Sequence, residues 1–477
     1  METEDWISYI LEMANQYYAG RQVVLWGAYS VSELMEEKLK ERYGIKVSFY
    51  VDGDIGKVDN VKVFSPDCLD GRPSEYYVII PIGFYQSVKD KLDLGGYKEE
   101  TDYYYFCDCI IHDDGNFYED SHGNKITGNY SGTKIVFSGF NSQITIGENV
   151  RFSNITMYIH SGCSIHIGDN SSIKDSDFCI GNCELDVVSS SNADTVLEIE
   201  KQCCIQYLTM ITSKYSVVRM GEAGNYEGDI SNNVYWKVGQ ESKLKIGYGC
   251  SFRCGHIVVQ RNANALIGDS CVFYNSEINM ENDAYMLIGA ETKMQTGVYC
   301  KVDCRVQQGG TLKIGSRCIF SNGQIFVWKN AVISIGKNFS IEKGYGLHAL
   351  PHTNILIGDD CMFSWEIQLL SSDAHSIFDV ITGEKINTVK NLSEKRKIEI
   401  GNHVWIGMRV TILYNTKIYD GSIIGACSVV KGIISNNCIA AGLSARIIRE
   451  NIAWCRDAEA EDIAEVEPQY INYTISE

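Results

Sequence analysis

Residues 400 to 430 place an aliphatic side chain at every sixth position, within the run IEIGNHVWIGMRVTILYNTKIYDGSIIGACSVV. The repeated positions are Ile400, Ile406, Ile412, Ile418, Ile424 and Val430. A period of six is neither the 3.6-residue repeat of an α-helix nor the simple alternation of a β-strand. It is typical of a triangular parallel β-helix, in which each hexad supplies one short strand and one tight corner.

A similar repeat with a longer and less regular period extends upstream of residue 400. Isoleucine-glycine pairs recur at intervals near 21 residues (168 − 147, for example), with glycines at Gly147, Gly168, Gly247, Gly268, Gly289, Gly315, Gly336, Gly358 and Gly401. We therefore predict a mainly β chain, with irregular β-helix coils over 125–370 and strict hexapeptide coils over 398–450. Left-handed winding is favoured because the strict hexads continue the longer coils. The stretch RMGEAGNYEGDISNN, from Arg219, is predicted to loop out.

The first 110 residues show a different pattern of apolar and polar residues. The segments QVVLWG, KVSFYVDGD and YYVIIPIG read as buried strands, and SVSELMEEKLKERYG reads as an amphipathic helix between the first two. This alternation predicts a small α/β, Rossmann-like domain over 1–110 with a parallel sheet. The loop GAYS keeps a single glycine, so the dinucleotide fingerprint is absent. At the other end, 451–477 is predicted to form a short helix and an acidic tail.

Composition excludes several classes of protein. The formal net charge of −19 argues against nucleic acid or an anionic membrane surface as the main partner. The chain starts without the basic region of a signal peptide and has no apolar run near the roughly 20 residues of a membrane span, so we expect a cytoplasmic protein. In that compartment the 18 cysteines are expected to be reduced, buried core residues, with no metal site.

One interval of the ladder is doubled, from Gly358 to Gly401 (401 − 358 = 43). The doubled stretch begins as a coil and then leaves the pattern, which predicts a loop over 371–397 that projects from a rigid scaffold. Functional groups are often mounted on such loops. This loop combines one imidazole with several carboxylates, on Asp373, His375, Asp379 and Glu384.

Residues 355 to 450 resemble the hexapeptide-repeat acetyltransferases that use acetyl-CoA, a family that includes galactoside, maltose and surface-polysaccharide O-acetyltransferases. The resembling segments are SSDAHSIFD, IEIGNHVWIGMRVTIL, SIIGACSVV and AAGLSARIIRE, in that order. The resemblance implies a left-handed parallel β-helix, direct acyl transfer without a covalent acyl-enzyme, and a homotrimer with active sites between neighbouring ladders.

The resemblance also implies roles for particular residues. His375 matches the loop histidine that acts as general base, and Asp373, Asp379 and Glu384 are alternative carboxylates that would orient its ring. The groove for coenzyme A would be lined by Trp405, Gly407, Gly425, Ala426 and Ser428, and its phosphates would be neutralised by Lys431, Arg446 and Arg449. The turn GLSAR lacks the proline that the family usually has there. His403 is expected to be a corner residue that faces solvent.

These features predict an acetyl-CoA-dependent O-acetyltransferase that modifies a sugar hydroxyl in the biosynthesis of a capsule-type or O-antigen-type surface polysaccharide. One alternative is an N-acetyltransferase of a nucleotide-linked amino sugar, which the N-terminal α/β unit favours. A second alternative is a non-catalytic β-helix that binds glycans or serves as a scaffold.

Overall fold

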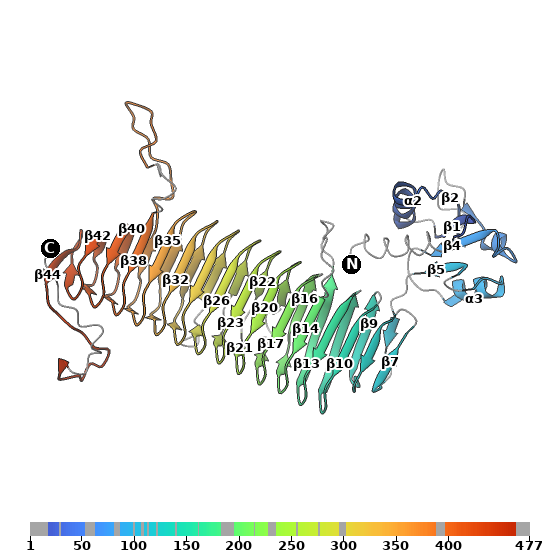
Figure 1. Cartoon of the computed structure of the whole chain (residues 1–477), viewed down its shortest axis with the longest axis horizontal. Helices are drawn as coiled ribbons and strands as arrows, with labels where there is room; N and C mark the ends of the chain where they lie inside the picture. The colour runs from blue at the N-terminus through green and yellow to red at the C-terminus, as the bar shows by residue number, and fades with distance from the viewer. Residues whose placement is uncertain are drawn as a thin grey trace.

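The computed structural model shows a long β-solenoid of about 15 turns with a small α/β unit near its N-terminal end (Figure 1). The predicted fold class is therefore confirmed, while the direction in which the coils wind stays a prediction. The structure describes residues 18–27, 30–52, 63–80, 86–98, 101–105, 109–111, 114–120, 123–138, 141–160, 162–182, 195–213, 215–227, 235–253, 256–274, 277–294, 302–387 and 396–463.

The α/β unit is built on a five-stranded parallel sheet in the order β3-β2-β1-β4-β5. Its elements are β1 (Gln22–Trp26), α2 (Ser30–Tyr43), β2 (Val47–Val51), β3 (Val63–Phe64), η1 (Pro66–Leu69), β4 (Tyr76–Ile80), α3 (Gln86–Leu94) and β5 (Tyr103–Tyr105). Strand β4 is buried throughout and the three middle residues of β1 are buried, because both faces of a parallel sheet are covered. Val24 and Val78 lie at the centre of this separate core.

The solenoid begins with an antiparallel section and then becomes a parallel ladder. Strand β6 (Cys109–Ile111) pairs antiparallel with β9 (Thr133–Ser138), and β7 (Phe117–Glu119) pairs antiparallel with β8 (Lys125–Thr127). From β10 (Gln143–Ile146) onward, each strand pairs in parallel with the equivalent strand of the next coil, except at the last strand, β44 (Arg446–Arg449).

The ladder has three faces, which we call A, B and C. Face A comprises β10, β12 (Cys163–Ile167), β14 (Thr195–Ile199), β17 (Val217–Met220), β20 (Lys243–Ile246), β23 (Asn264–Ile267), β26 (Tyr285–Ile288), β29 (Thr311–Ile314), β32 (Val332–Ile335), β35 (Asn354–Ile357), β38 (Lys397–Ile400) and the second halves of β40 (Thr411–Ile418) and β42 (Val429–Ile434).

Face B follows A in each coil. It comprises the first parts of β11 (Arg151–His160) and β13 (Ser172–Asn182), then β15 (Cys204–Gln206), β18 (Asn225–Glu227), β21 (Ser251–Arg253), β24 (Val272–Tyr274), β27 (Lys293–Met294), β30 (Ile319–Phe320), β33 (Ser340–Ile341), β36 (Met362–Phe363), β39 (Trp405–Ile406), β41 (Ile423–Ile424) and β43 (Ile439–Ala441).

Face C completes the triangle. It comprises β9, the later parts of β11 and β13, then β16 (Thr209–Ser213), β19 (Tyr235–Val238), β22 (Ile257–Val259), β25 (Glu277–Met280), β28 (Val302–Val306), β31 (Gly323–Val327), β34 (Tyr345–Ala349), β37 (Gln368–Leu370) and the first halves of β40 and β42.

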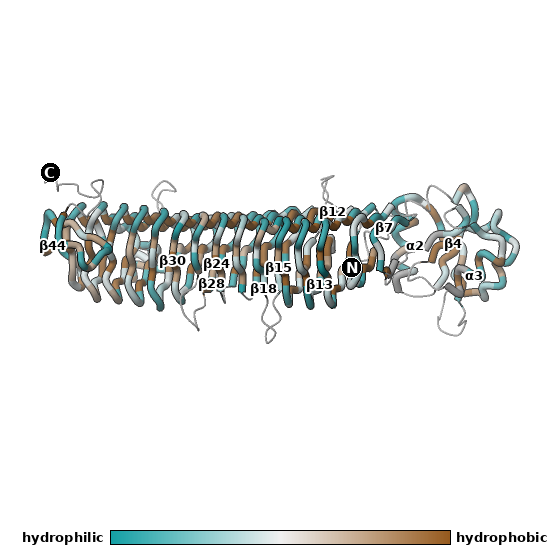
Figure 2. Tube along the Cα trace, turned by 90° about the horizontal axis from the view of Figure 1, so that it is seen from below, coloured by the Kyte–Doolittle hydropathy of each residue, from teal (hydrophilic) through white to brown (hydrophobic). Residues whose placement is uncertain are grey.

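Inward side chains stack in register along the ladder. On face A, Leu312 pairs with Ile333, which pairs with Ile355, which pairs with Ile398, and all four are fully buried. Hydrophobic and hydrophilic residues alternate along each coil in Figure 2. Because each coil buries its apolar side against the coils above and below, one continuous core runs through the solenoid.

The glycine after each inward isoleucine is required by stacking. A Cβ atom on Gly401 would lie 2.1 Å from Oδ1 of Asp420 in the next coil. That oxygen accepts a hydrogen bond from the backbone N–H of Asn402 at 2.7 Å. The carboxylate of one coil therefore occupies the space that a side chain of the preceding coil would need. This explains why a glycine follows the inward isoleucine.

Several cysteines form an internal ladder of thiol donors. The thiols of Cys271, Cys318 and Cys361 each donate to a glycine carbonyl of the following coil, at 3.2, 3.2 and 3.1 Å. All three side chains are fully buried, and burial raises the pKa of Cys318 to about 11 and that of Cys361 to about 12. These residues are free thiols, which confirms the prediction of buried core cysteines for them.

One local expectation was wrong. Arg219 and Met220 lie in β17 and Asn225–Glu227 form β18, both in register with neighbouring coils, where an insertion was predicted, and 228–234 fall outside the described residues. From Asn451 to Asp462 the chain forms bends, turns and extended segments, and because 464–477 lie outside the described residues, the short helix expected within 451–477 stays a prediction. None of the described helices has the length and hydrophobicity of a membrane span.

Candidate active site

The predicted loop leaves the ladder after β37 and returns at β38, so it replaces the corner between faces C and A (Figure 1). Its outer part is a tight hairpin, with a bridge between Phe378 and Lys385. Residues 388–395 of the loop lie outside the described residues.

His375 lies near the root of the loop, and its side chain is exposed. Asn387 contacts the loop at His375 and on both sides of it. The side-chain amide of Asn387 donates to the carbonyl of His375 at 2.6 Å and to the carboxylate of Asp373 at 3.2 Å, and it accepts from the N–H of Ile377 at 2.9 Å. One amide therefore contacts Asp373, His375 and Ile377.

Arg396 ties the returning end of the loop to its beginning. Its Nη1 donates to the hydroxyl of Ser372 at 2.9 Å and to the carboxylate of Asp373 at 3.0 Å, and its Nη2 donates to the carbonyl of Asn387 at 2.9 Å. The side chains of Arg396 and Asp373 are 13% and 22% exposed, so this ion pair is better shielded than an ordinary surface pair. Asn387 and Arg396 together form a clamp on the loop root.

Two of the three carboxylates that were candidates to orient His375, those of Asp373 and Asp379, have other partners. Loss of hydration would raise the pKa of Asp373, but hydrogen bonds from Asn387 and Tyr414 and the charge of Arg396 hold it below its usual value. Asp379 accepts from the N–H groups of Ile381 and Thr382, both at 2.8 Å, and these bonds lower its pKa.

Glu384 contributes its backbone carbonyl to the hairpin, accepting from the N–H of Asp379 at 2.8 Å. Among the described residues, no carboxylate is hydrogen-bonded to the ring of His375. The carboxylates of Asp373 and Asp379 therefore stabilise the loop, and the imidazole of His375 stays exposed to solvent.

Two cations and an aromatic ring lie at the corner between faces C and A, where the loop leaves the ladder. Tyr414 occupies this corner in the next coil, with Arg396 Cζ 4.6 Å and Lys431 Nζ 4.5 Å from the centre of its ring. Cations are attracted to the faces of aromatic rings at such distances. The structure thus places Lys431 at the loop root, whereas the sequence grouped it only with the distant arginines.

The predicted small residues line a different corner, between faces B and C. A Cβ atom on Gly407 would lie 2.8 Å from Ala426 N and Ile424 O, and one on Gly425 would lie 2.9 Å from Ala441 Cβ. Both glycines are therefore needed for coil stacking, and they also keep this corner narrow. Ala426 is exposed on it.

The remaining predicted residues differ in where they lie relative to this corner. Trp405 points outward from face B and is 38% exposed. Ser428 is fully buried; its hydroxyl donates to the Gly425 carbonyl at 2.7 Å and accepts from Gly442 N–H at 3.0 Å, so it serves the corner instead of facing a ligand. Arg446 and Arg449 are exposed on β44, antiparallel to β43 at the end of the ladder.

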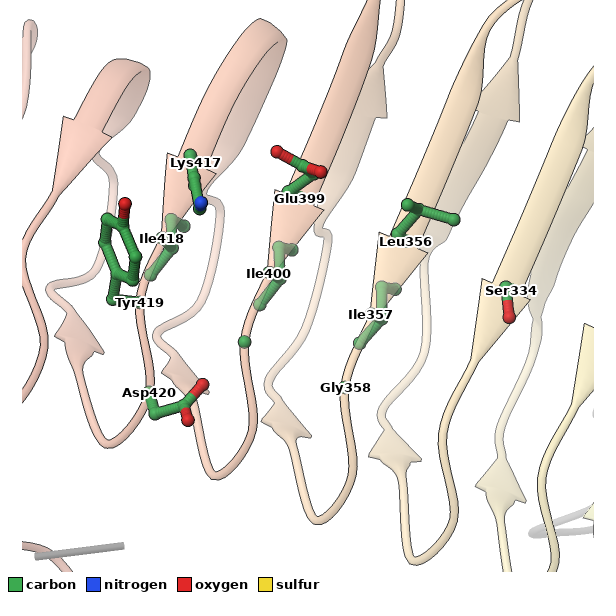
Figure 3. A pocket seen from close by; sticks show the side chains of 11 residues that line it. Ser334, Leu356, Ile357, Gly358, Glu399, Ile400, Lys417, Ile418, Tyr419 and Asp420 are labelled. Carbon is green, nitrogen blue, oxygen red and sulfur yellow. The ribbon is translucent and has the colours of Figure 1, made fainter.

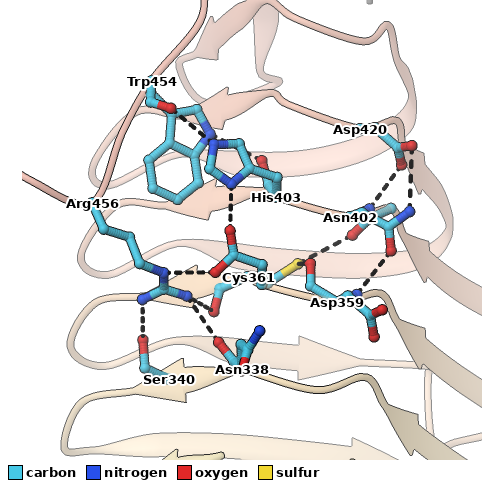
Figure 4. Close-up of polar contacts among 11 residues, drawn as sticks. Asn338, Ser340, Asp359, Cys361, Asn402, His403, Asp420, Trp454 and Arg456 are labelled. Carbon is cyan, nitrogen blue, oxygen red and sulfur yellow. Dashed lines mark hydrogen bonds and ion pairs between the residues drawn. The ribbon is translucent and has the colours of Figure 1, made fainter. Parts of the chain in front are cut away.

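Sequence reasoning missed a polar cluster around His403. This residue does occupy a corner, with a φ of 52°, but it is only 5% exposed, so the expectation that it faces solvent was wrong. Its Nδ1 lies 2.6 Å from Asp360 Oδ2 and its Nε2 lies 2.8 Å from the carbonyl of Trp454 (Figure 4). The partners lie 43 and 51 residues away, and no local pattern marks them.

The geometry assigns His403 a structural role. Both ring nitrogens face acceptors, so the two hydrogen bonds form together when the imidazole carries two protons. Burial alone would raise the pKa of Asp360, but hydrogen bonds from His403 and Arg456 and their charges lower it. A buried imidazole with both nitrogens engaged is not available to take a proton from an external acceptor, unlike the exposed ring of His375.

A shallow groove of about 320 Å³ lies on face A and is lined by outward side chains that include Leu356, Glu399, Lys417 and Tyr419 (Figure 3). It lies away from the corner with Gly407 and Gly425 and contains none of the predicted site residues. Within the described parts of the chain, no group of three or more His, Cys, Asp or Glu side chains is placed to hold a metal ion.

Comparison with known proteins gives concordant results. Residues 397–432 match the family described as bacterial transferase hexapeptide (six repeats). The chain is 35% identical over 112 residues to the polysialic acid O-acetyltransferase of Escherichia coli O1:K1 / APEC, an alignment that covers 24% of this chain and 34% of that protein. It is 30% identical over 159 residues to the polysialic acid O-acetyltransferase of Neisseria meningitidis, covering 33% and 58% respectively.

The chain thus spans between 34% and 58% of the length of these two relatives. Among solved structures, the polySia-specific acetyltransferase NeuO aligns with a TM-score of 0.22 and 18% identity, over 71% of this chain and 95% of that one. Residues 397–432 match the six-residue repeat that this family model describes.

Proposed function

We propose that this protein is an acetyl-CoA-dependent O-acetyltransferase that modifies a sugar hydroxyl in the biosynthesis of a surface polysaccharide of the capsule or O-antigen type. The observation that carries the proposal is the clamped loop, which holds an exposed imidazole, that of His375, beside hexapeptide coils. The names of the relatives, both polysialic acid O-acetyltransferases, support the same reaction class.

In this proposal the imidazole of His375 takes the proton of the acceptor hydroxyl while that oxygen attacks the thioester carbonyl of acetyl-CoA. The carbon–sulfur bond then breaks, and the proton passes from the imidazolium to the departing thiolate. Imidazole suits both transfers because its ordinary pKa lies near neutrality. Asp373 acts on His375 through the clamp on its backbone. The role of Glu384 as a carboxylate that orients the ring of His375 stays a prediction.

The proposed path of coenzyme A uses the narrow corner and the C-terminal end of the ladder. Gly407, Gly425 and Ala426 leave the backbone accessible to the amides of the pantetheine arm. Trp405 supplies a partly exposed aromatic surface. Arg446 and Arg449, both exposed at the end of the ladder, would neutralise the phosphates. Lys431 lies at the loop root, and its predicted share in this role stays a prediction.

We further propose that the site is completed by a second copy of the chain, within a homotrimer. The hairpin exposes Val380 by 97% and Ile381 by 91%, and Phe378 by 57%, an apolar tip that needs a cover. A neighbouring ladder would cover this tip and supply a polar partner for the ring of His375, which has none among the described residues of its own loop. Light scattering on the unmodified chain and on a Val380→Ser/Ile381→Ser variant tests this, since a monomeric unmodified chain contradicts it.

The α/β unit favours a second candidate, an N-acetyltransferase of a nucleotide-linked amino sugar. Its sheet order reverses between β1 and β4, and ligands of open parallel sheets bind at such switch points. Under this alternative the acceptor nitrogen, not an oxygen, would be acylated.

Consumption of acetyl-CoA with hydroxyl sugars and amino sugars in parallel separates the two candidates. The His375→Ala variant should lose transfer, whereas His352→Ala, at the equivalent corner one coil earlier and also exposed, should keep it. Retention of full transfer by His375→Ala refutes the proposed base. Glycan binding without any acetyl-CoA consumption would support the scaffold alternative.

A further inference from the structure

The chain beyond the last coil turns back along the ladder as an extended strap, residues 451–457. The N–H of Ile452 donates to the carbonyl of Asn437 at 2.9 Å, and the side chain of Asn437 donates to the carbonyl of Ile452 at 3.1 Å. Two residues later, Trp454 Nε1 donates to the carbonyl of His403 at 2.9 Å. Every second residue of the strap is thus fastened to an earlier coil.

Arg456 is the farthest anchor (Figure 4). Its Nε donates to Asp360 at 2.8 Å, its Nη1 donates to the hydroxyl of Ser340 at 3.0 Å, and its Nη2 donates to the carbonyls of Asn338 and Cys361 at 3.0 and 2.9 Å. These partners lie 95 to 118 residues earlier in the chain. The strap therefore crosses the corner between faces A and B in the reverse direction.

The strap places an aromatic ring between His403 and Trp405. The indole of Trp454 stacks on the imidazole of His403, with ring centres 3.9 Å apart and planes 12° apart. Its ring centre lies 5.9 Å from that of Trp405, at an angle of 48°. Trp454 is only 6% exposed, so the strap buries it while Trp405 keeps one open side.

We infer that the strap positions Trp405 for coenzyme A, so that docking of the strap and binding of coenzyme A are coupled. This inference rests on the proposed function, in which Trp405 contacts the ligand. An outward indole on a narrow strand has freedom to rotate, and contact with Trp454 restricts it. Because pre-ordering a binding side chain lowers the entropic cost of binding, release of the strap should weaken coenzyme A affinity.

Arg456 is the residue to change, because its anchors are remote from both tryptophans. Arg456→Ala should weaken the binding of coenzyme A to the full chain about tenfold, measured by titration calorimetry, with the coil fold intact by circular dichroism. Arg305→Ala removes an equally charged side chain, which pairs with Asp303 at 2.9 Å on face C, and should leave the affinity unchanged.

A double-mutant cycle distinguishes positioning from general loss of structure. In a Trp405→Ala background, Arg456→Ala should have no further effect on coenzyme A affinity. The inference is overturned if Arg456→Ala binds like the unmodified chain, or if it weakens binding equally with and without Trp405. If the unmodified chain does not bind coenzyme A at all, the proposed function fails and this inference fails with it.

Discussion

Asn387 offers the sharpest test of how the loop prepares His375. Replacement by alanine removes two neutral hydrogen bonds, to His375 O and Ile377 N, and one to the carboxylate of Asp373. Neutral bonds contribute about 1 kcal/mol each, and a bond to a charged group contributes about 1.5 kcal/mol or more. Because the loop is largely exposed, we reduce the total to about 2 kcal/mol. That loss predicts a fall in kcat of about 30-fold, at about 1.4 kcal/mol per tenfold.

The assay is steady-state consumption of acetyl-CoA, with kcat and KM determined separately. The clamp acts on the loop and not on the narrow corner, so kcat should fall while the affinity for coenzyme A stays unchanged. Asn387→Asp keeps the acceptor for Ile377 N–H but loses both donors and adds a charge beside Asp373, so it should be at least as damaging. An unchanged kcat in Asn387→Ala, or a loss seen only as weaker coenzyme A binding, would refute this reasoning.

Three further predictions concern the scaffold. Gly401→Ala should lower the free energy of unfolding by about 1–3 kcal/mol in a denaturant titration, because its Cβ would meet Asp420 Oδ1 at 2.1 Å; unchanged stability would contradict the stacking argument. A thiol reagent at pH 8 should label the exposed Cys427 at once but reach Cys361 only after unfolding, since burial raises the pKa of Cys361 to about 12; mass spectrometry after digestion reads this directly. The pKa of Asp360 is lowered in the folded chain, so its contribution to stability is present above about pH 4, its unfolded value, and is lost as the pH falls through the lower folded value. The difference in stability between the unmodified chain and Asp360→Asn should therefore shrink on acidification, and a constant difference would argue against the pair with His403.

Some residues of the candidate site could be predicted from the sequence, and others could not. His375 was identifiable because the doubled glycine interval isolates its loop and because SSDAHSIFD matches a known family. The partners of His375 were not identifiable, since the sequence offers several nearby carboxylates and the structure uses an amide, Asn387, 12 residues away. Ser428 matched a motif equally well, yet its phase in the coil turns the hydroxyl inward.

The ladder itself was determined by the sequence alone. Each coil contacts only its neighbours, so the positions of Ile400, Ile406 and Ile412 along the chain already specify which side chains face the core. What only the tertiary structure decided are the contacts made across the repeat. The strap joins Arg456 to Asp360, 96 residues away, and no periodicity relates them. Those contacts depend on where the chain turns back after its last coil, which a one-dimensional repeat does not encode.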